Sequence, residues 1–214
     1  MNDPKKTDEN KTGESNGAYY LYGVVRSRTG WRGKERRNQD LQRVRYRDIE
    51  AVVRPSAFEL PPDHATAVRD HQQVLEGLLR RTTVLPAPVG ILFNGRRPLI
   101  RLLQDQYLIF DEGLSLLDGH WELRLHITGT GTAEEMEALD DEAMSVYAEL
   151  RRFARAAVPM PKSEGKLTSA AFLVDRTSWV EFIERIEHFG AHHKNLTFDT
   201  TGPWPAYDFV RIVT

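Results

Sequence analysis

Histidine is the residue type in this 214-residue chain that could do the most varied chemistry, because imidazole binds metal ions and titrates near neutral pH. The seven histidines include a group at His188, His192 and His193. Gly190 is expected to end a helix between them, and no acidic residue stands at an obvious ligand spacing. The group is either a metal site or, as the spacing favours, the polar end of a helix. His71 shares the apolar stripe of another expected helix, which indicates a hydrogen-bonded core residue over a general base.

Carboxylates could also do chemistry, and six of them crowd one stretch: Glu134, Glu135, Glu137, Asp140, Asp141 and Glu142. The run lacks the spacing and the central glycine of a calcium loop, so it indicates a solvated helix start. The Gly-Thr-Gly-Thr sequence at 129–132 is only a weak anion-binding signal. No Gly-rich phosphate loop, Gly-x-Ser-x-Gly elbow or His-Glu-x-x-His motif is present, and there is no cysteine. We expect no catalytic residue, no metal and no cofactor.

The composition indicates a folded protein with no general attraction to polyanions. Hydrophobic residues make up 40% of the chain, and 29 basic residues against 31 acidic ones leave a net charge of −2. Nucleic acid is therefore an unlikely global partner, and any such contact must be local. No stretch approaches the ~20 apolar residues that cross a bilayer. The first residues are too polar for a secretory signal, so we expect a cytoplasmic protein without a membrane partner.

The pattern of elements predicts an α+β protein with two domains. Residues 1–17 are polar and are expected to form a disordered tail. Residues 18–118 are expected to form an amino-terminal α+β domain, with a first strand at 18–25, a strand pair or a strand entering the core at 42–55, a helix at 61–82, a bent strand at 83–95 and a second helix at 97–119.

Residues 119–214 are expected to form a ferredoxin-like (split βαβ) domain with an antiparallel sheet. A strand at 120–128 alternates apolar and polar residues, and a long helix over 132–159 opens with a capping box at Thr132 and Glu135. The remaining elements are a strand at 166–175, a helix at 178–190 that opens with Ser178 and Glu181, and a strand at 195–200.

The sequence TGPWPAYDFV (201–210) is the densest aromatic and proline motif of the chain. Two prolines flank Trp204 and remove amide donors, so we expect the preceding strand to end there. Tyr207 and Phe209 alternate with polar or smaller residues, which predicts a short last strand. The motif is either a rigid corner that covers the core, or an exposed surface in which Trp204, Tyr207 and Phe209 bind a partner.

A second candidate surface is the basic stretch at 26–40, which lacks apolar periodicity and is typical of a solvated loop. As an alternative, the loop at 26–37 could contact phosphate groups, which would make the chain an anion- or nucleic-acid-binding module. The anion-binding residues would then be Arg26, Arg28, Arg32, Lys34, Arg36 and Arg37.

Two segments, AAFLVDRTSWVEFIERIEHF (170–189) and NLTFDTTGPWPAYDFV (195–210), resemble the carboxy-terminal signature of the gas vesicle protein F/L family. YLYGVV (20–25), WELRLHI (121–127) and the stretch at 68–93 resemble other parts of that family. The resemblance implies a non-enzymatic accessory or structural protein of gas vesicles. Its partners would be the small apolar shell protein and other accessory proteins, and its location would be the cytoplasm and the gas vesicle.

Overall fold

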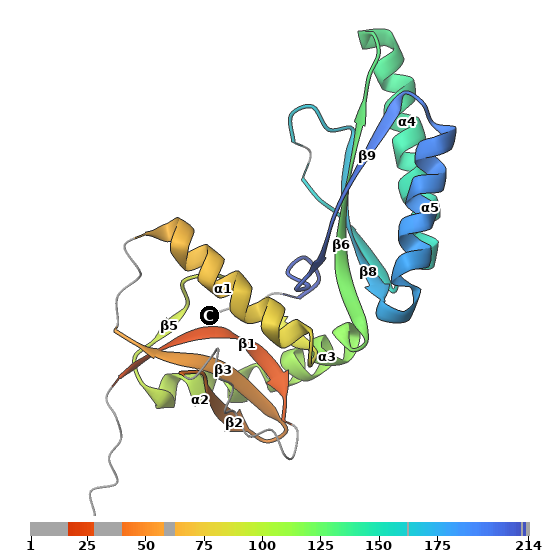
Figure 1. The fold of residues 1–214 in the computed structure, drawn as a ribbon. Coiled ribbons are helices and arrows are strands. Elements are labelled where there is room, and N and C mark those ends of the chain that lie inside the picture. The colour runs from red at the N-terminus through yellow and green to blue at the C-terminus, as the bar shows by residue number, and fades with distance from the viewer. Residues whose placement is uncertain (1–16, 28–39, 58–62, 162, 211, 213–214) are drawn as a thin grey trace, which may run out of the picture.

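The computed structural model describes residues 17–27, 40–57, 63–161, 163–210 and 212. The expected disordered tail at 1–17 lies outside this range except for its last residue. Figure 1 shows two groups of strands and helices that extend in different directions from a common junction.

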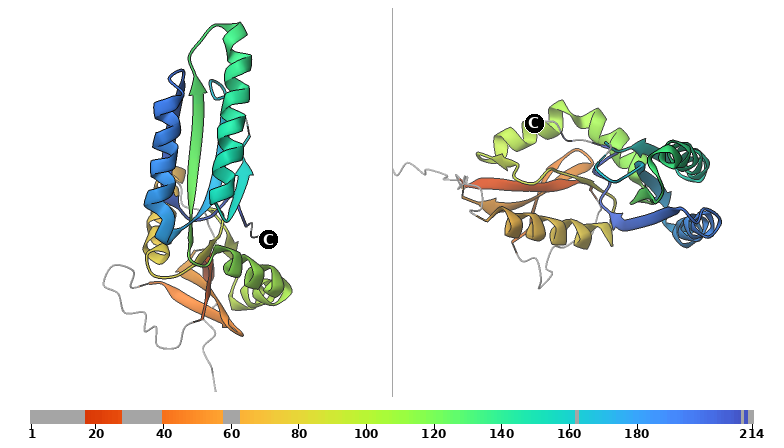
Figure 2. Two further views of the ribbon diagram at one scale, coloured as in Figure 1. Left: turned by 90° about the vertical axis from the view of Figure 1, so that its right-hand side faces the viewer. Right: turned by 90° about the horizontal axis from the view of Figure 1, so that it is seen from above.

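The first sheet is covered by helices on both faces (Figure 2, right). One core joins Leu21 to Leu99 and Phe110, and the other joins Tyr22 to Val74 and Leu75. Every residue of the central strand from 18 to 25 is buried, because its side chains alternate between these two cores. The sheet has the order β2-β3-β1-β4, and β5 also pairs with β1. Its elements are β1 (Ala18–Arg26), β2 (Gln42–Tyr46), β3 (Ile49–Ser56), α1 (His64–Leu79), β4 (Val84–Pro86), β5 (Leu92–Phe93), α2 (Arg96–Asp105) and α3 (Tyr107–Leu117).

Among the described elements, the helices that pack on the second sheet both lie on one face of it, as Figure 1 shows. Its order is β7-β8-β6-β9, all neighbours are antiparallel, and the chain order is strand, helix, strand, strand, helix, strand. Leu125, Phe172, Val146 and Phe182 belong to the core between sheet and helices. The elements are β6 (His120–Gly129), α4 (Ala133–Leu150), η1 (Arg151–Phe153), β7 (Ala156–Pro159), β8 (Thr168–Asp175), η2 (Arg176–Ser178), α5 (Trp179–His192) and β9 (Leu196–Trp204).

The expected α+β class is confirmed, and several element boundaries are corrected. The expected helix at 132–159 ends at Leu150, and Phe153, which lies beyond this end, is 45% exposed. Residues 156–159 instead pair with β8 as an edge strand, so tertiary pairing overrides local helix propensity. The capping box at Thr132 and Glu135 is present. The expected helix at 97–119 is two helices that meet at Gln106.

Two expectations about the end of the chain are also wrong. The GPW sequence continues β9, and Trp204 pairs with Glu122 across a register shift. An edge strand tolerates Pro203, because a missing amide on the free side breaks no ladder bond. No last strand forms at 207–210; these residues make a turn.

The helix that we expected to end at Gly190 is also longer than predicted. Helix α5 runs past Gly190 to His192, and the Ser178 side chain makes no capping hydrogen bond.

Gly23 sits where strand β1 passes close to β4. A Cβ atom at this position would lie 2.6 Å from the Leu85 carbonyl oxygen and 3.0 Å from a Val84 methyl group. Backbone cannot withdraw from a central strand without disturbing its neighbours, so Gly23→Ala is expected to lower the free energy of unfolding by about 2 kcal/mol. Gly77→Ala is the matched control. It lies inside α1, where the added Cβ meets no described residue within 4 Å apart from its own helix backbone and chain neighbours, and it should stabilise by about 0.5–1 kcal/mol. Equal effects in urea unfolding would contradict the close approach.

Candidate interaction site

The carboxy-terminal strap, defined as residues 205–210 and Ile212, connects the two sheets. It leaves β9 at Trp204 and returns to the first sheet, where Ile212 is 5% exposed and belongs to the core with α2 and α3. Between these ends, Ala206 is buried against Leu117 and Leu173, which come from different halves of the chain. The expected division at residue 119 stays a prediction, and the strap packs its last residues on the first half.

A charged network fixes the strap to strand β6. The Arg124 Nε donates to Glu122 Oε1 at 2.8 Å and to Asp208 Oδ2 at 3.0 Å. The Asp208 amide donates in turn to Glu122 Oε2 at 3.0 Å. The Glu122 side chain is 0% exposed, so both of its oxygens depend on these contacts. The network holds the turn at 207–210 against the second sheet.

Burial sets the protonation of this network. Removal from water raises the pKa of Glu122 to about 7, the Asp208 charge adds to the rise, and the Asp208 amide and Arg124 oppose it. Burial likewise raises the pKa of the Tyr207 hydroxyl. Glu122 therefore titrates near neutral pH, at the point where the strap meets β6.

The structure places the three aromatic residues of the motif in different surroundings, all of them half-buried. Tyr207 packs against the core that contains Tyr20, Tyr22 and α1, and Phe209 packs against Leu117 and Leu173. Trp204 ends β9, and its indole Nε1 donates to Thr201 Oγ1 at 3.0 Å. Tyr207 and Phe209 thus take part in packing at the junction, and their partner contact stays a prediction.

Of the six basic residues in the alternative anion site, only Arg26 is described. Its guanidinium donates to Asp111 Oδ1 at 2.5 Å, to Asp48 Oδ2 at 3.1 Å and to Ser115 Oγ at 2.7 Å. This side chain ties β1 to α3 and to the β2–β3 turn. Arg28, Arg32, Lys34, Arg36 and Arg37 lie outside the described residues.

His71 is a hydrogen-bonded core residue, as the sequence indicated. It is 1% exposed, and its Nε2 lies 2.9 Å from the Ala87 carbonyl oxygen. A carbonyl only accepts, so Nε2 carries the proton and Nδ1 accepts from the Tyr20 hydroxyl at 2.9 Å. The same hydroxyl accepts from the Gly90 amide at 3.1 Å. The contacts join α1, β1 and the loop after β4.

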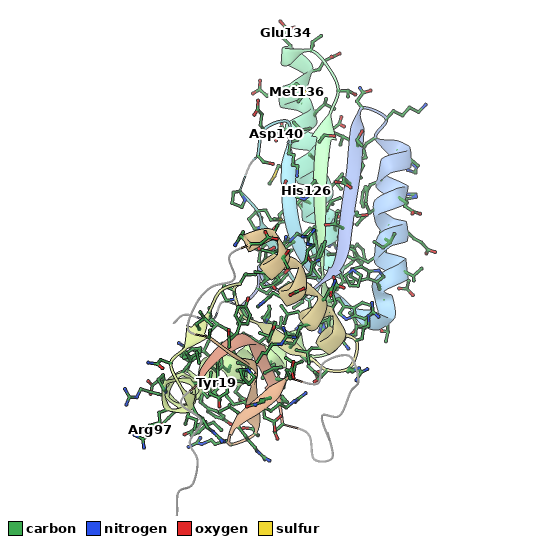
Figure 3. All side chains as sticks on the ribbon, turned by 60° about the vertical axis from the view of Figure 1, so that its left-hand side comes forward. Tyr19, Arg97, His126, Glu134, Met136 and Asp140 are labelled. Atoms are coloured by element: carbon green, nitrogen blue, oxygen red, sulfur yellow. The ribbon has the colours of Figure 1, made fainter. Side chains whose placement is uncertain are left out.

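The other candidate chemistry is dispersed. His188 and His192 stack at 4.2 Å between ring centroids, while His193 Nδ1 lies 3.2 Å from a Glu142 carboxylate oxygen. Across the described part of the chain, no three histidine, aspartate or glutamate side chains are arranged to hold a metal ion. Glu134 and Asp140 lie on α4 at the end away from the first sheet (Figure 3). No helix formed by the described residues is long and apolar enough to cross a membrane.

Sequence reasoning missed Glu122 as the centre of the junction. In the sequence it is one polar residue of an alternating strand, and such residues usually face water. The available signal was Asp208, a charged residue inside an otherwise apolar motif. A buried partner for it was not predictable, because the strap reaches β6 only through the tertiary fold.

These features define a class of protein with two α+β units joined by a carboxy-terminal strap. The family model described as gas vesicle synthesis protein GvpL/GvpF matches residues 18–151 and 130–211, so the chain belongs to that family.

Similar proteins cover most of the chain. Gas vesicle protein F1 of Halobacterium salinarum is 25% identical over 209 residues, which span 90% of this chain and 92% of that protein. Gas vesicle protein F2 of the same organism is 27% identical over 178 residues, 79% of each chain. Gas vesicle protein L of a Streptomyces species is 24% identical over 189 residues, 69% of this chain and 70% of that protein.

Two crystal structures share the fold. The gas vesicle protein GvpF from Anabaena superposes with a TM-score of 0.77 at 16% identity, covering 92% of this chain and 98% of that one. The GvpF from Microcystis aeruginosa superposes with a TM-score of 0.74 at 16% identity, covering 90% of this chain and 98% of that one. The arrangement of both sheets is therefore shared across very different sequences.

Proposed function

We propose that this chain is a gas vesicle accessory protein that takes part in assembly in the cytoplasm by binding the shell protein or another accessory protein. The single observation that supports this most is the family match, which extends across residues 18–211. The proposal includes no catalysis, since the chemistry-bearing side chains described above act as packing and hydrogen-bonding groups.

Within this proposal, the partner contacts the end of β9, with Trp204 as its aromatic anchor. The indole is half-buried and held by Thr201, so little side-chain freedom is lost on binding. Tyr207 and Phe209 would contribute mainly by holding the strap in place. The alternative anion-binding function gains no support from Arg26, whose guanidinium already pairs with two carboxylates.

The test is co-purification of the tagged chain with a co-expressed gas vesicle shell protein. Trp204→Ala is expected to reduce the retained shell protein about tenfold, as for a central aromatic contact. Phe153→Ala is the matched control, because this exposed aromatic ring belongs to η1, outside β9 and the strap, and lies under the Arg185 guanidinium of α5. Thermal melting must first show that both variants fold.

If Trp204→Ala retains as much shell protein as the wild type, Trp204 lies outside the interface. If the wild type retains neither the shell protein nor any co-expressed gas vesicle accessory protein, the proposed function is wrong. Binding that weakens steeply with salt and survives Trp204→Ala would favour the anion-binding alternative.

A further inference from the structure

Strand β9 forms a long free edge of the second sheet. It runs for nine residues, and within the described part of the chain it pairs with β6 alone, on one side. The opposite edge is formed by β7, which has four residues and ends at Pro159. Short length and proline are devices that protect an edge from further pairing. From Leu196 to Thr201, β9 contains neither a proline nor a glycine.

The register shows which backbone groups of β9 face outward. The Thr130 amide donates to the Asn195 carbonyl oxygen at 3.0 Å, so this opposed pair is hydrogen-bonded. Hydrogen-bonded pairs alternate along an antiparallel ladder. In the register of β6 and β9, residues 197, 199 and 201 therefore bond to β6. The amides and carbonyls of Phe198 and Thr200 point to the free side, whereas the Leu196 amide already donates to the His193 carbonyl oxygen at 3.0 Å.

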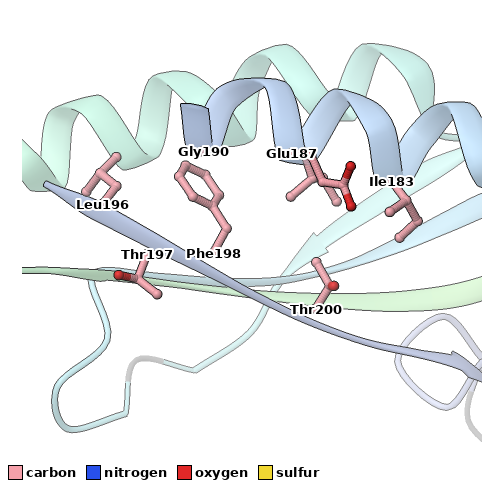
Figure 4. A pocket seen from close by; sticks show the side chains of 8 residues that line it. Ile183, Glu187, Gly190, Leu196, Thr197, Phe198 and Thr200 are labelled. Carbon is pink, nitrogen blue, oxygen red and sulfur yellow. The ribbon is translucent and has the colours of Figure 1, made fainter. Parts of the chain in front are cut away.

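A groove lies beside this edge, between β9 and helix α5. It has a volume of about 430 Å³ and is lined by Ile183, Ile186, Glu187, Gly190, Leu196, Thr197, Phe198 and Thr200. Figure 4 shows side chains of α5 and the ring of Phe198 directed into the space between helix and strand. Gly190 leaves room at one end, because a Cβ built there meets no described residue outside its own helix turn closer than a Phe198 ring carbon at 3.5 Å.

A strand added at the β9 edge would direct alternate side chains into the groove. Side chains alternate between the two faces of a strand, and Leu196 and Phe198 pack toward the helices. An added strand that bonds to the outward groups of Phe198 and Thr200 places its opposed residues on that same face. Every second side chain of the added strand would then enter the groove.

The lining also specifies the chemistry of the occupant. It combines the apolar side chains of isoleucine, leucine and phenylalanine with two threonine side chains, and Glu187 is the one charged group among the lining residues. Glu184, less than one helical turn earlier, is exposed on α5. A carboxylate beside an apolar groove is complemented by an aliphatic side chain followed by a lysine or arginine on the same face.

We propose that the β9 edge and the α5 groove bind an extended segment of a partner protein by strand addition. The segment carries aliphatic side chains at alternate positions, followed on the same face by a basic residue that pairs with Glu187. This inference does not depend on the gas vesicle function, because it follows from the edge and the groove alone.

The experiment uses the full chain and the synthetic peptide Ac-Ser-Val-Thr-Val-Ser-Lys-Thr-NH2, whose valines and lysine lie on one face. Amide resonances of the ¹⁵N-labelled protein are followed during titration up to ~1 mM peptide, the range of weak binding. We expect the largest shifts at Leu196, Phe198, Thr200 and Gly190. A peptide with glutamate in place of lysine is expected to bind about tenfold more weakly, a difference of about 1.4 kcal/mol.

Three variants separate the backbone edge, the groove and the charge. Gly190→Leu fills the groove and should weaken binding about tenfold, while Ala191→Leu on the exposed side of α5 should change it less than about twofold. Thr200→Pro removes an outward amide without removing a bond to β6, and should also weaken binding. Glu187→Lys should reverse the preference between the lysine and glutamate peptides.

Melting curves establish that each variant is folded before it is compared. Absence of binding by the wild type, shifts that map elsewhere, or unchanged binding by Gly190→Leu would each overturn the proposal. The peptide contains no gas vesicle sequence. Failure here therefore leaves the co-purification result with the shell protein unaffected, and the two proposals are judged separately.

Discussion

Glu122→Gln is expected to become more stable relative to the wild type as the pH rises from 4.5 to 8. The pKa of Glu122 rises from 4.5 to about 7 on folding, so between these values the folded protein keeps a proton that the unfolded chain releases. Wild-type stability from this group is present below pH 4.5 and falls as the pH rises to about 7. Across this pH range, the wild type loses about 3 kcal/mol of its free energy of unfolding through the titration of Glu122.

The measurement is urea unfolding of both proteins at a series of pH values. Titrating groups away from this network contribute equally to the two curves, so the gap between the curves reports on Glu122 and its neighbour Asp208. Asp208→Asn is the second control, because it removes the neighbouring charge that helps to raise the pKa of Glu122. It should shrink the change without abolishing it. Parallel curves for wild type and Glu122→Gln would show that folding does not raise the pKa of Glu122.

His71→Ala is expected to lower the free energy of unfolding by about 4 kcal/mol. The substitution opens a cavity in the core between α1 and β1, which by itself costs a few kcal/mol. It also leaves the Ala87 carbonyl without the donor that it has in the wild type. Thermal or urea unfolding measures the loss, and a change below about 1 kcal/mol would contradict the buried contacts.

Tyr20→Phe separates the hydrogen bonds from the packing at the same place. It keeps the ring but removes the hydroxyl that joins His71 to the Gly90 amide, so a loss of about 1–2 kcal/mol in the free energy of unfolding is expected.

Burial lowers the pKa of His71 below 6.5, so as the pH falls the unfolded chain takes up a proton before the folded protein does. Stability from this group is present above pH 6.5 and falls as the pH drops below it. His71→Ala should remove that part of the pH dependence.

The strap gives the family motif a physical meaning. Its prolines and aromatic residues lie where one sheet ends and the other begins, and Asp208 closes the network with Glu122 and Arg124. Residues 205–210 of the motif therefore link the two sheets, as the interpretation of a rigid corner implies. Trp204, at the end of β9, is the proposed contact with the partner. The rigid corner and the partner-binding surface, the two interpretations made from the sequence, thus involve different residues of the same short segment.

Local patterns were enough to predict the α+β class and most of the elements. The alternation of Leu123, Leu125 and Ile127 identifies β6, and the stripe containing Val74 and Leu75 identifies α1. These patterns work because each element buries one face, and burial repeats with the period of the helix or strand. The motif at 201–210 likewise pointed to the family that the comparisons establish.

Only the tertiary structure decided the remaining features, because they depend on which segments become neighbours. Residues 156–159 form a strand only beside β8, although their sequence continues a helical pattern. Glu122 looks like any outward polar residue until the strap covers it. The groove beside β9 exists because α5 packs over an edge strand whose outward side has no neighbour among the described residues. Strand pairing and the burial of one segment by another involve residues that are far apart in the sequence, so the local spacing of apolar residues does not predict them.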